Sequence, residues 1–274
     1  MVVPPLAALD ALQSLILGLV EGLTEYLPVS STGHLIIADH FLGIQGEGSK
    51  AFDVVIQIGA ILAVLGLYRR RVGQMALGLV GRDREGGNLL LNLAIAFMPA
   101  AVIGLMIEKR IKALFDVRHV AWALLVGGVL MIAADLLLRR RRERRGLPLE
   151  RLGPQGALVI GLFQVLAMWP GTSRSLVTII GGLIVGLTPL AAAEFSFLLA
   201  LPTLSAAALY EVVFHHAEMA GAVGAGPLIV GLLAAAVSAA FAVKGFVAWL
   251  VRHGFVPFGA YRIVAAAVVF LFVL

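Results

Sequence analysis

The chain has 274 residues, of which 61% are hydrophobic and 14% are charged, and its mean hydropathy is +1.00. A soluble domain has about 45–50% apolar and about 25% charged residues, so this composition excludes a water-soluble fold and predicts a polytopic membrane protein. The pI of about 10 comes from basic residues in short loops between apolar segments, which favours a topology signal over nucleic-acid binding. The lack of cysteine excludes disulfides, thiolate metal sites and a cysteine nucleophile.

Six apolar segments are long enough to cross the hydrocarbon as helices, which takes about 20 residues. They cover residues 52–68, 88–107, 119–138, 190–214, 224–250 and 258–274. Two shorter apolar stretches, 6–20 and 153–168, each run into a polar turn and then into a second apolar piece, at 35–44 and 176–187. Irregular backbone is tolerated at membrane depth only where protein or a wet cavity surrounds it. The sequence therefore predicts an all-α integral membrane protein with six transmembrane helices and two re-entrant helix pairs.

The loop charges support this assignment of the segments. If both broken segments are re-entrant, three basic loops share one side, with 14 Lys and Arg residues against five on the other side. The positive-inside rule makes the basic side cytoplasmic and places both termini outside. We expect a single membrane domain over residues 1–274, with a basic cytoplasmic loop at 139–152 between its two halves.

The two halves look like a duplication with inverted topology. Each half contains one re-entrant pair followed by three spans, and an odd number of spans inverts the second half. One constant offset in residue number pairs Leu15 with Leu158, Gly18 with Gly161, Leu19 with Leu162, Leu23 with Leu166, Ser30 with Ser173, and Phe52 with Phe195. We expect repeat 1 at about 6–138 and repeat 2 at about 153–274. Such repeats place a site near the midplane, where broken helices meet, so a transporter or lipid flippase is a serious alternative to an enzyme.

The first broken segment carries two carboxylates and a dense set of hydroxyls. Glu21 and Glu25 are four residues apart and share one helical face. In a poorly solvated pocket they would share a proton, bind a divalent cation or face a cationic partner. The polar residues that follow are Ser30, Ser31, Thr32 and His34. Histidine is the usual base for a serine nucleophile, whereas the alternative is that the carboxylates pair with arginine and the hydroxyls cap helix ends.

The second broken segment supplies a complementary positive charge. Its turn reads Pro170-Gly-Thr-Ser173-Arg174-Ser175 and opens a helix. Backbone N–H groups at a helix start attract anions, and arginine adds a charged fork that suits phosphate oxygens. This turn predicts a phosphate cradle, although Arg174 could instead neutralise one of the two glutamates. Glu194 is either a residue near the site or an ordinary charge at a helix start, and we leave this open. Arg262, near the start of the last span, could reach the pocket or extend its charge toward the interface, and we expect the second.

At these residues the sequence resembles the undecaprenyl-diphosphatase family, also called bacitracin-resistance proteins. The resemblance rests on Glu21-Gly-Leu-Thr-Glu25-Tyr-Leu-Pro-Val-Ser-Ser-Thr-Gly-His34 and on the Pro170–Ser175 turn, and it continues through Glu194-Phe-Ser-Phe and Tyr261-Arg262. It implies an integral enzyme of the bacterial plasma membrane. Such an enzyme removes the terminal phosphate of undecaprenyl diphosphate and so recycles the lipid carrier for cell-wall synthesis.

The resemblance also implies roles for individual residues. Glu21 and Glu25 match an acidic motif that handles protons or a divalent cation, Mg²⁺ or Ca²⁺. Ser31 matches the proposed nucleophile, His34 its neighbouring base or acid, and Arg174 the phosphate-binding arginine. Hydroxyl positions that line the pocket match Ser30, Ser173 and Thr178, and the residue pattern adds Thr32 and Ser175 as substrate-binding candidates. Departures from the family pattern are Leu176, where many members have glycine, and Gln164 and Met168, which take the places of the two glutamates in repeat 2.

Two mechanisms fit these residues. In the first, Ser31 attacks the distal phosphorus while His34 takes its proton, and water then hydrolyses the phosphoserine. In the second, a Glu or His activates a water molecule and Ser31 only binds phosphate. The expected partners are a polyprenyl diphosphate and membrane lipid, with no nucleic acid, and a homodimer is left open. We expect the site to open toward the outer or periplasmic face.

Overall fold

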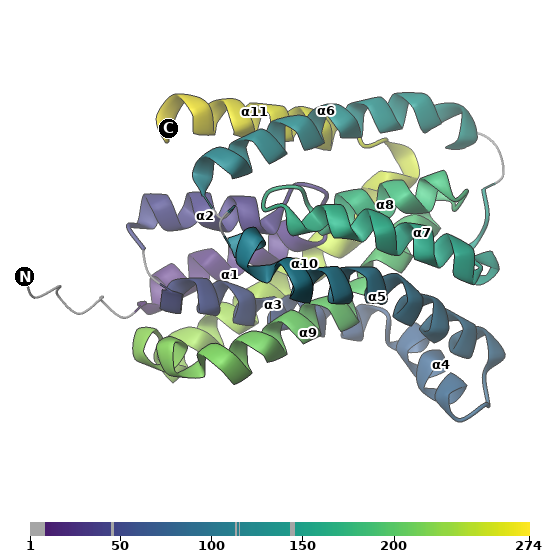
Figure 1. Cartoon of the computed structure of the whole chain (residues 1–274), viewed down its shortest axis with the longest axis horizontal. Helices are drawn as coiled ribbons and strands as arrows, with labels where there is room; N and C mark the ends of the chain where they lie inside the picture. Colours follow the sequence, from purple (N-terminus) through teal and green to yellow (C-terminus); the bar gives the residue numbers. More distant parts are fainter. Residues whose placement is uncertain (1–8, 45–46, 113, 115, 143–145) are drawn as a thin grey trace, which may run out of the picture.

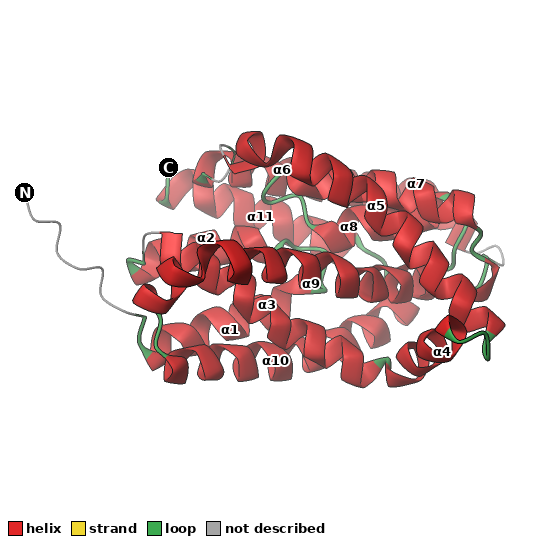
Figure 2. Ribbon diagram, turned by 60° about the horizontal axis from the view of Figure 1, so that its bottom comes forward, coloured by secondary structure: helices red, strands yellow, loops and turns green. Residues whose placement is uncertain are grey.

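The protein is described by a computed structural model that covers residues 9–44, 47–112, 114, 116–142 and 146–274. Within these ranges the backbone is helical and forms no β-sheet (Figure 2). Arg144 and Arg145, which belong to the expected basic loop, lie outside the described residues, as do residues 6–8 of the first apolar stretch.

Each apolar segment forms a helix, and each broken segment forms two. The helices of the first half are α1 (Ala11–Glu25), α2 (Ser31–Leu42), α3 (Glu47–Leu67), α4 (Arg69–Leu79), α5 (Arg84–Lys112) and α6 (Val117–Arg142). Those of the second half are η1 (Leu149–Arg151), α7 (Pro154–Val165), η2 (Leu166–Met168), α8 (Arg174–Ile184), α9 (Pro189–Ala222), α10 (Ala225–Arg252) and α11 (Val256–Phe272). The basic run that begins at Arg69 starts the short helix α4, where the sequence predicts a loop.

Several of these helices are long and apolar enough to cross a membrane. Four meet that requirement in the described residues, within α5, α6, α9 and α10. A fifth is obtained if α3 and α4, which meet at a bend of 83°, are counted as one span, and α11 is a shorter apolar helix. Large apolar side chains such as Leu137, Leu105 and Leu271 are more than 70% exposed, as expected for helices that face lipid. The chain is therefore a multi-pass helical membrane protein.

The helices pack in pairs that relate the two halves. Helix α1 packs on α10 and α7 packs on α5, while α3 lies against α9 and α6 lies against α11 (Figure 1). Glycine permits the first two contacts. A methyl group added at Gly18 would lie 2.3 Å from the carbonyl oxygen of Gly231, and one at Gly161 would lie 2.5 Å from that of Ala96. The close approaches of α1 to α10 and of α7 to α5 thus depend on two glycines that the offset of the repeat pairs with each other.

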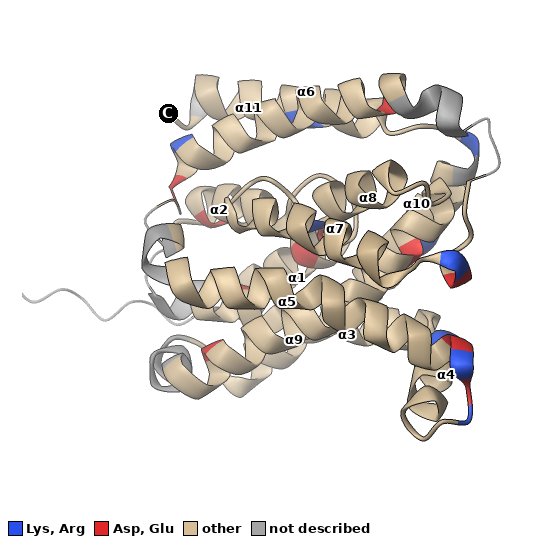
Figure 3. Ribbon diagram, turned by 45° about the vertical axis from the view of Figure 1, so that its right-hand side comes forward, with Lys and Arg blue, Asp and Glu red and all other residues tan. Residues whose placement is uncertain are grey.

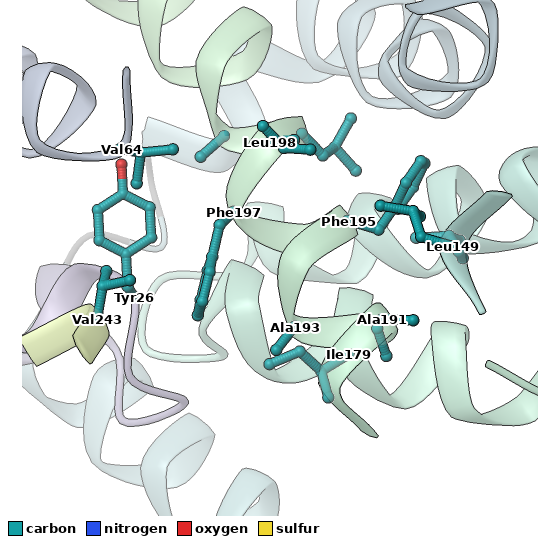
Figure 4. Close-up of a cluster of buried hydrophobic side chains, with 14 of the residues drawn as sticks. Tyr26, Val64, Leu149, Ile179, Ala191, Ala193, Phe195, Phe197, Leu198 and Val243 are labelled. Carbon is teal, nitrogen blue, oxygen red and sulfur yellow. The ribbon is translucent and has the colours of Figure 1, made fainter. Parts of the chain in front are cut away.

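The buried core surrounds the beginning of α9. Phe195, Phe197 and Leu198 of this helix are fully buried, and the ring of Tyr26 meets that of Phe197 edge to face at 5.3 Å (Figure 4). Most of the charged residues that are described lie at the ends of helices, notably around α4, but a few lie within the bundle (Figure 3). The interior charges include Glu21 and Glu25 of α1, Arg174 at the start of α8 and Arg262 of α11.

Candidate functional site

The turn between α1 and α2 and the turn before α8 have similar backbone conformations at their last residue. Ser30 and Ser173, which the constant offset in residue number pairs with each other, have φ angles of 76° and 78° and are the non-glycine residues with positive φ in the described chain. Each hydroxyl accepts a hydrogen bond from the backbone N–H three residues later, from Gly33 at 3.2 Å and from Leu176 at 3.3 Å. A left-handed backbone costs a non-glycine residue about 1–3 kcal/mol, so surrounding contacts must hold both turns in place.

The Arg174 side chain, on the first turn of α8, forms a buried ion pair with Glu25 at the end of α1. Arg174 Nη2 donates to Glu25 Oε1 at 2.7 Å, and the two side chains are 9% and 6% exposed. Arg174 Nη1 donates to the carbonyl oxygen of Ser196 on α9 at 2.7 Å, and the guanidinium carbon lies 5.8 Å from the centre of the Tyr26 ring. Arg174 Nε is buried and has no hydrogen-bond acceptor among the described residues. A donor in this state fits an incoming oxyanion.

The Ser31 hydroxyl completes this cluster from the first turn of α2. Ser31 is 7% exposed, and its hydroxyl donates to Glu25 Oε2. Glu25 therefore holds the predicted nucleophile with one carboxylate oxygen and the predicted phosphate-binding arginine with the other. Three helices, α1, α2 and α8, meet through this one side chain.

Glu21 lies one turn before Glu25 on α1 and is fully buried. Neither of its carboxylate oxygens has a hydrogen-bond partner among the described residues. A buried carboxylate without a partner is costly, which fits the binding of a proton or a cation at this position. The described chain contains no group of three or more His, Asp or Glu side chains arranged to hold a metal. A cation at Glu21 would therefore need oxygen ligands from hydroxyls, carbonyls, water or substrate, which Mg²⁺ and Ca²⁺ accept.

The structure does not bring His34 to the Ser31 hydroxyl. His34 Nδ1 lies 2.7 Å from the carbonyl oxygen of Ser30, and Nε2 lies 2.6 Å from the hydroxyl of Tyr261 at the start of α11. A carbonyl only accepts hydrogen bonds, so Nδ1 carries a proton, and when the ring is neutral Nε2 accepts from the Tyr261 hydroxyl. The two rings also stack, with planes 6° apart. Both nitrogens are thus occupied, and Glu25 is the acid–base group that contacts Ser31.

The other predicted hydroxyls hold Arg174 and the two turns. Thr178 donates to the carbonyl oxygen of Arg174 at 2.8 Å, and its hydroxyl lies 2.7 Å from that of Ser196. Ser175 donates across to the carbonyl oxygen of Leu27 at 2.9 Å and so links the second turn to the first. The hydroxyls of Ser173 and Ser175 are 3.0 Å apart. Thr32 is half-buried on the first turn of α2.

The structure corrects the expected position of Arg262 and shows the partner of Glu194. Arg262 does not extend toward the interface, because its side chain is 0% exposed and donates to main-chain carbonyls inside the bundle. Glu194 pairs with Arg71 of α4 at 2.7 Å rather than with Arg174.

Tyr26 was not predicted from the sequence, although its ring lies below Arg174 and its hydroxyl donates to the carbonyl oxygen of Ala60 at 2.9 Å. Its position directly after Glu25 is the one signal that could have indicated it.

Comparison with known proteins gives matches along almost the whole chain. Residues 14–268 match the family described as "Bacitracin resistance protein BacA". A protein of Sorangium cellulosum named undecaprenyl-diphosphatase is 48% identical over 258 residues, which cover 93% of this chain and 84% of the relative. Proteins of the same name from Wolinella succinogenes and Methylococcus capsulatus are 45% and 46% identical, and the matches cover 97% and 95% of this chain and 99% and 94% of the relatives.

Proposed function

The chain belongs to the bacitracin resistance protein BacA family, and on this premise we propose that it is an undecaprenyl-diphosphatase whose reaction takes place at Ser31, Glu25 and Arg174. It hydrolyses undecaprenyl diphosphate to undecaprenyl phosphate and inorganic phosphate, which returns the lipid carrier to cell-wall synthesis. The observation that carries the assignment of the site is one buried cluster. It joins a serine hydroxyl, a carboxylate and an arginine with a free Nε–H. A transporter or flippase, which moves the lipid without reacting with it, has no need of such a serine.

Arg174 supplies the positive charge for the diphosphate. Its guanidinium is permanently charged, and in a dry site its hydrogen bonds to phosphate oxygens are much stronger than in water. The Nε–H has no acceptor among the described residues, and the substrate competes with Glu25 for the Nη2 donor. Substrate binding therefore loosens the ion pair and frees the Glu25 carboxylate to act on Ser31.

Ser31 is the nucleophile in the mechanism that we propose. Its Oγ forms a bond to the distal phosphorus, the bond from that phosphorus to the bridging oxygen breaks, and undecaprenyl phosphate leaves. The hydroxyl proton passes to Glu25, which takes the role that the sequence analysis gave to His34, because Glu25 accepts the Ser31 hydrogen bond. Water then attacks the phosphoserine, which releases inorganic phosphate and restores the hydroxyl.

A divalent cation, Mg²⁺ or Ca²⁺, would be held by Glu21 with Glu25. When bound, it would supply further neutralisation of the diphosphate charge. The support for this site is the fully buried Glu21 carboxylate without a partner in the described chain. We expect chelator to abolish phosphate release and added Mg²⁺ or Ca²⁺ to restore it. Release that survives chelation would leave Arg174 and the helix N-termini as the charge stabilisers.

The finer topology is also part of the proposal. We infer six spans, two re-entrant pairs and an inverted repeat in the bacterial inner membrane, with the site open to the outer face. The matched packing of α1 on α10 and of α7 on α5 supports the repeat, as do the matched φ angles of Ser30 and Ser173. The chain has no cysteine, so a single introduced cysteine is the only thiol that a labelling reagent can modify. Lys50→Cys should react with an impermeant thiol reagent from outside and Arg82→Cys should not, and the reverse result would invert the topology.

The first experiment is phosphate release from undecaprenyl diphosphate by the purified protein in detergent. Ser31→Ala should abolish turnover, and a phosphoenzyme should be trapped on Ser31 of the wild-type protein. Ser238→Ala is the matched control, since Ser238 is also buried but its hydroxyl donates to main-chain carbonyl oxygens, that of Ala234 at 2.7 Å and that of Gly18 at 3.4 Å. Partial activity of Ser31→Ala without a phosphoenzyme would favour direct attack by water. No release from folded wild-type protein would overturn the enzyme assignment and promote a lipid flippase.

A further inference from the structure

We propose that Arg262 is a positioning residue that holds the two turns of the site in register. Its Nη1 donates to the carbonyl oxygen of Pro28 at 3.4 Å, and its Nη2 donates to that of Gly171 at 2.8 Å. Pro28 and Gly171 occupy equivalent positions, because the offset that pairs Ser30 with Ser173 also pairs these two residues. One guanidinium thus joins equivalent carbonyls of the two halves.

Further bonds fix the same guanidinium to α6. Nη2 also donates to the carbonyl oxygen of Ala123 at 2.9 Å, and Nε donates to that of Leu124 at 3.4 Å. The Arg262 side chain is fully buried, and in the part of the chain that the structure describes its hydrogen bonds all go to main-chain carbonyls rather than to a carboxylate. Burying a charge without a counter-ion is expensive, and an apolar side chain of similar volume would fill the space at lower cost. Packing alone therefore does not account for an arginine here, whereas its planar fork of five donors can join separate carbonyls.

The joined carbonyls lie close in sequence to the reacting groups. Pro28 precedes Ser31 by three residues, and Gly171 precedes Arg174 by three residues. The separation between the nucleophile and the phosphate-binding arginine therefore depends on how far apart the two turns are held. An error of about 1 Å in such an alignment can cost about 10²-fold in rate. Arg262 contacts neither Ser31 nor Arg174 in the structure and acts through the turns that carry them.

This inference rests on the proposed diphosphatase function, and its test is a double-mutant cycle on phosphate release. Arg262→Met should lower kcat by about 10²-fold in folded protein, and Arg262→Lys, which keeps the charge without the fork, should recover part of that loss. In an Arg174→Ala background, Arg262→Met should cost less than about 10-fold, because the turn it aligns no longer carries the phosphate ligand. A purely structural role would lower the folded fraction and would leave the two kcat losses multiplicative.

Gly127→Ala tests the same contact without removing Arg262. A methyl group at Gly127 would lie 2.2 Å from Arg262 Nη2, so it must displace the guanidinium from its acceptors. Gly66→Ala is the matched control, since nothing lies within 4 Å of a methyl group there. Gly127→Ala should lower kcat at least 10-fold more than Gly66→Ala does. Wild-type turnover in folded Gly127→Ala or Arg262→Met, or multiplicative losses in the cycle, would overturn this inference, whereas an inactive wild-type protein would instead overturn the proposed function.

Discussion

The two turns share a backbone and differ in chemistry. Both end with a serine of positive φ whose hydroxyl caps the next helix, and in both the residue after this serine is the first of that helix. At that equivalent position the first turn has Ser31 and the second has Arg174. Two helix starts with similar caps thus meet inside the bundle, and the residue at one position supplies a hydroxyl on one of them and a cation on the other.

The helices that precede the turns differ in the same way. Helix α1 carries Glu21 and Glu25, whereas α7 and η2 carry Gln164 and Met168 at the equivalent positions of the second repeat. Of these two segments, the first therefore supplies the carboxylates, and Glu25 forms an ion pair with Arg174 of the second half. Neither turn contains a complete site, and the chemistry exists only where the halves meet.

Apart from loss of the proposed nucleophile Ser31, the largest effect is expected when Arg174, the positive charge of the site, is replaced. Arg174→Ala removes the charge and the free Nε–H donor from a buried site, and we expect kcat/KM for phosphate release to fall about 10³-fold or more. Arg174→Lys should restore only a small part, because an ammonium group cannot replace the fork. The loss should equal or exceed that of any proton-carrying residue. Near wild-type turnover of Arg174→Ala would refute the assignment of this turn to phosphate binding.

The carboxylate that joins the turns should come next. Glu25→Gln keeps the shape but removes the charge that pairs with Arg174 and accepts from Ser31, so kcat should fall about 10²-fold. An unpaired buried guanidinium should also lower the free energy of unfolding by about 3 kcal/mol, seen as a lower Tm. Glu150→Gln is the control, because its pair with Arg71 is 34% exposed on the Glu150 side and should contribute about 0–1 kcal/mol. Equal Tm losses for the two variants would show that the buried pair has no special role in stability.

The symmetry of the scaffold can be tested through its helix contacts. Gly18→Ala and Gly161→Ala each force a methyl group against a backbone carbonyl, so each should destabilise the fold by about 1–3 kcal/mol. Gly245→Ala adds a methyl group with nothing within 4 Å and should be neutral or stabilising by less than about 1 kcal/mol. Thermal unfolding in detergent measures all three. A loss at only one of the paired glycines would indicate that the α1–α10 and α7–α5 contacts are not equivalent.

The sequence predicted the helices and the two broken segments well, because their signals are local. Segment length, proline and glycine indicate where an apolar helix is interrupted, and the pairing of Arg174 with a glutamate was one of the alternatives weighed. The partner of His34 could not be predicted, because Tyr261 lies 227 residues away and neither segment has a pattern that indicates contact with the other. Arg262 was wrongly expected at the interface because its acceptors are main-chain carbonyls, which every residue provides and no pattern marks.

The smallest effect is expected where the second half has lost its carboxylate. Gln164, the counterpart of Glu21, is 2% exposed, and its Nε2 has no acceptor among the described residues. Its Oε1 accepts from Thr203, which also donates to the carbonyl oxygen of Leu199 at 2.8 Å and so keeps a partner without it. Gln164→Leu should therefore leave phosphate release within about 3-fold of wild type. The substitution loses one weak hydrogen bond from Thr203 and removes one buried N–H donor that has no acceptor. Glu21→Gln, measured beside it, should cost at least about 10-fold, because the carboxylate is what a proton or cation requires. Equal losses at the two positions would mean that the halves share the chemistry after all, and the division of labour between the two turns would be wrong.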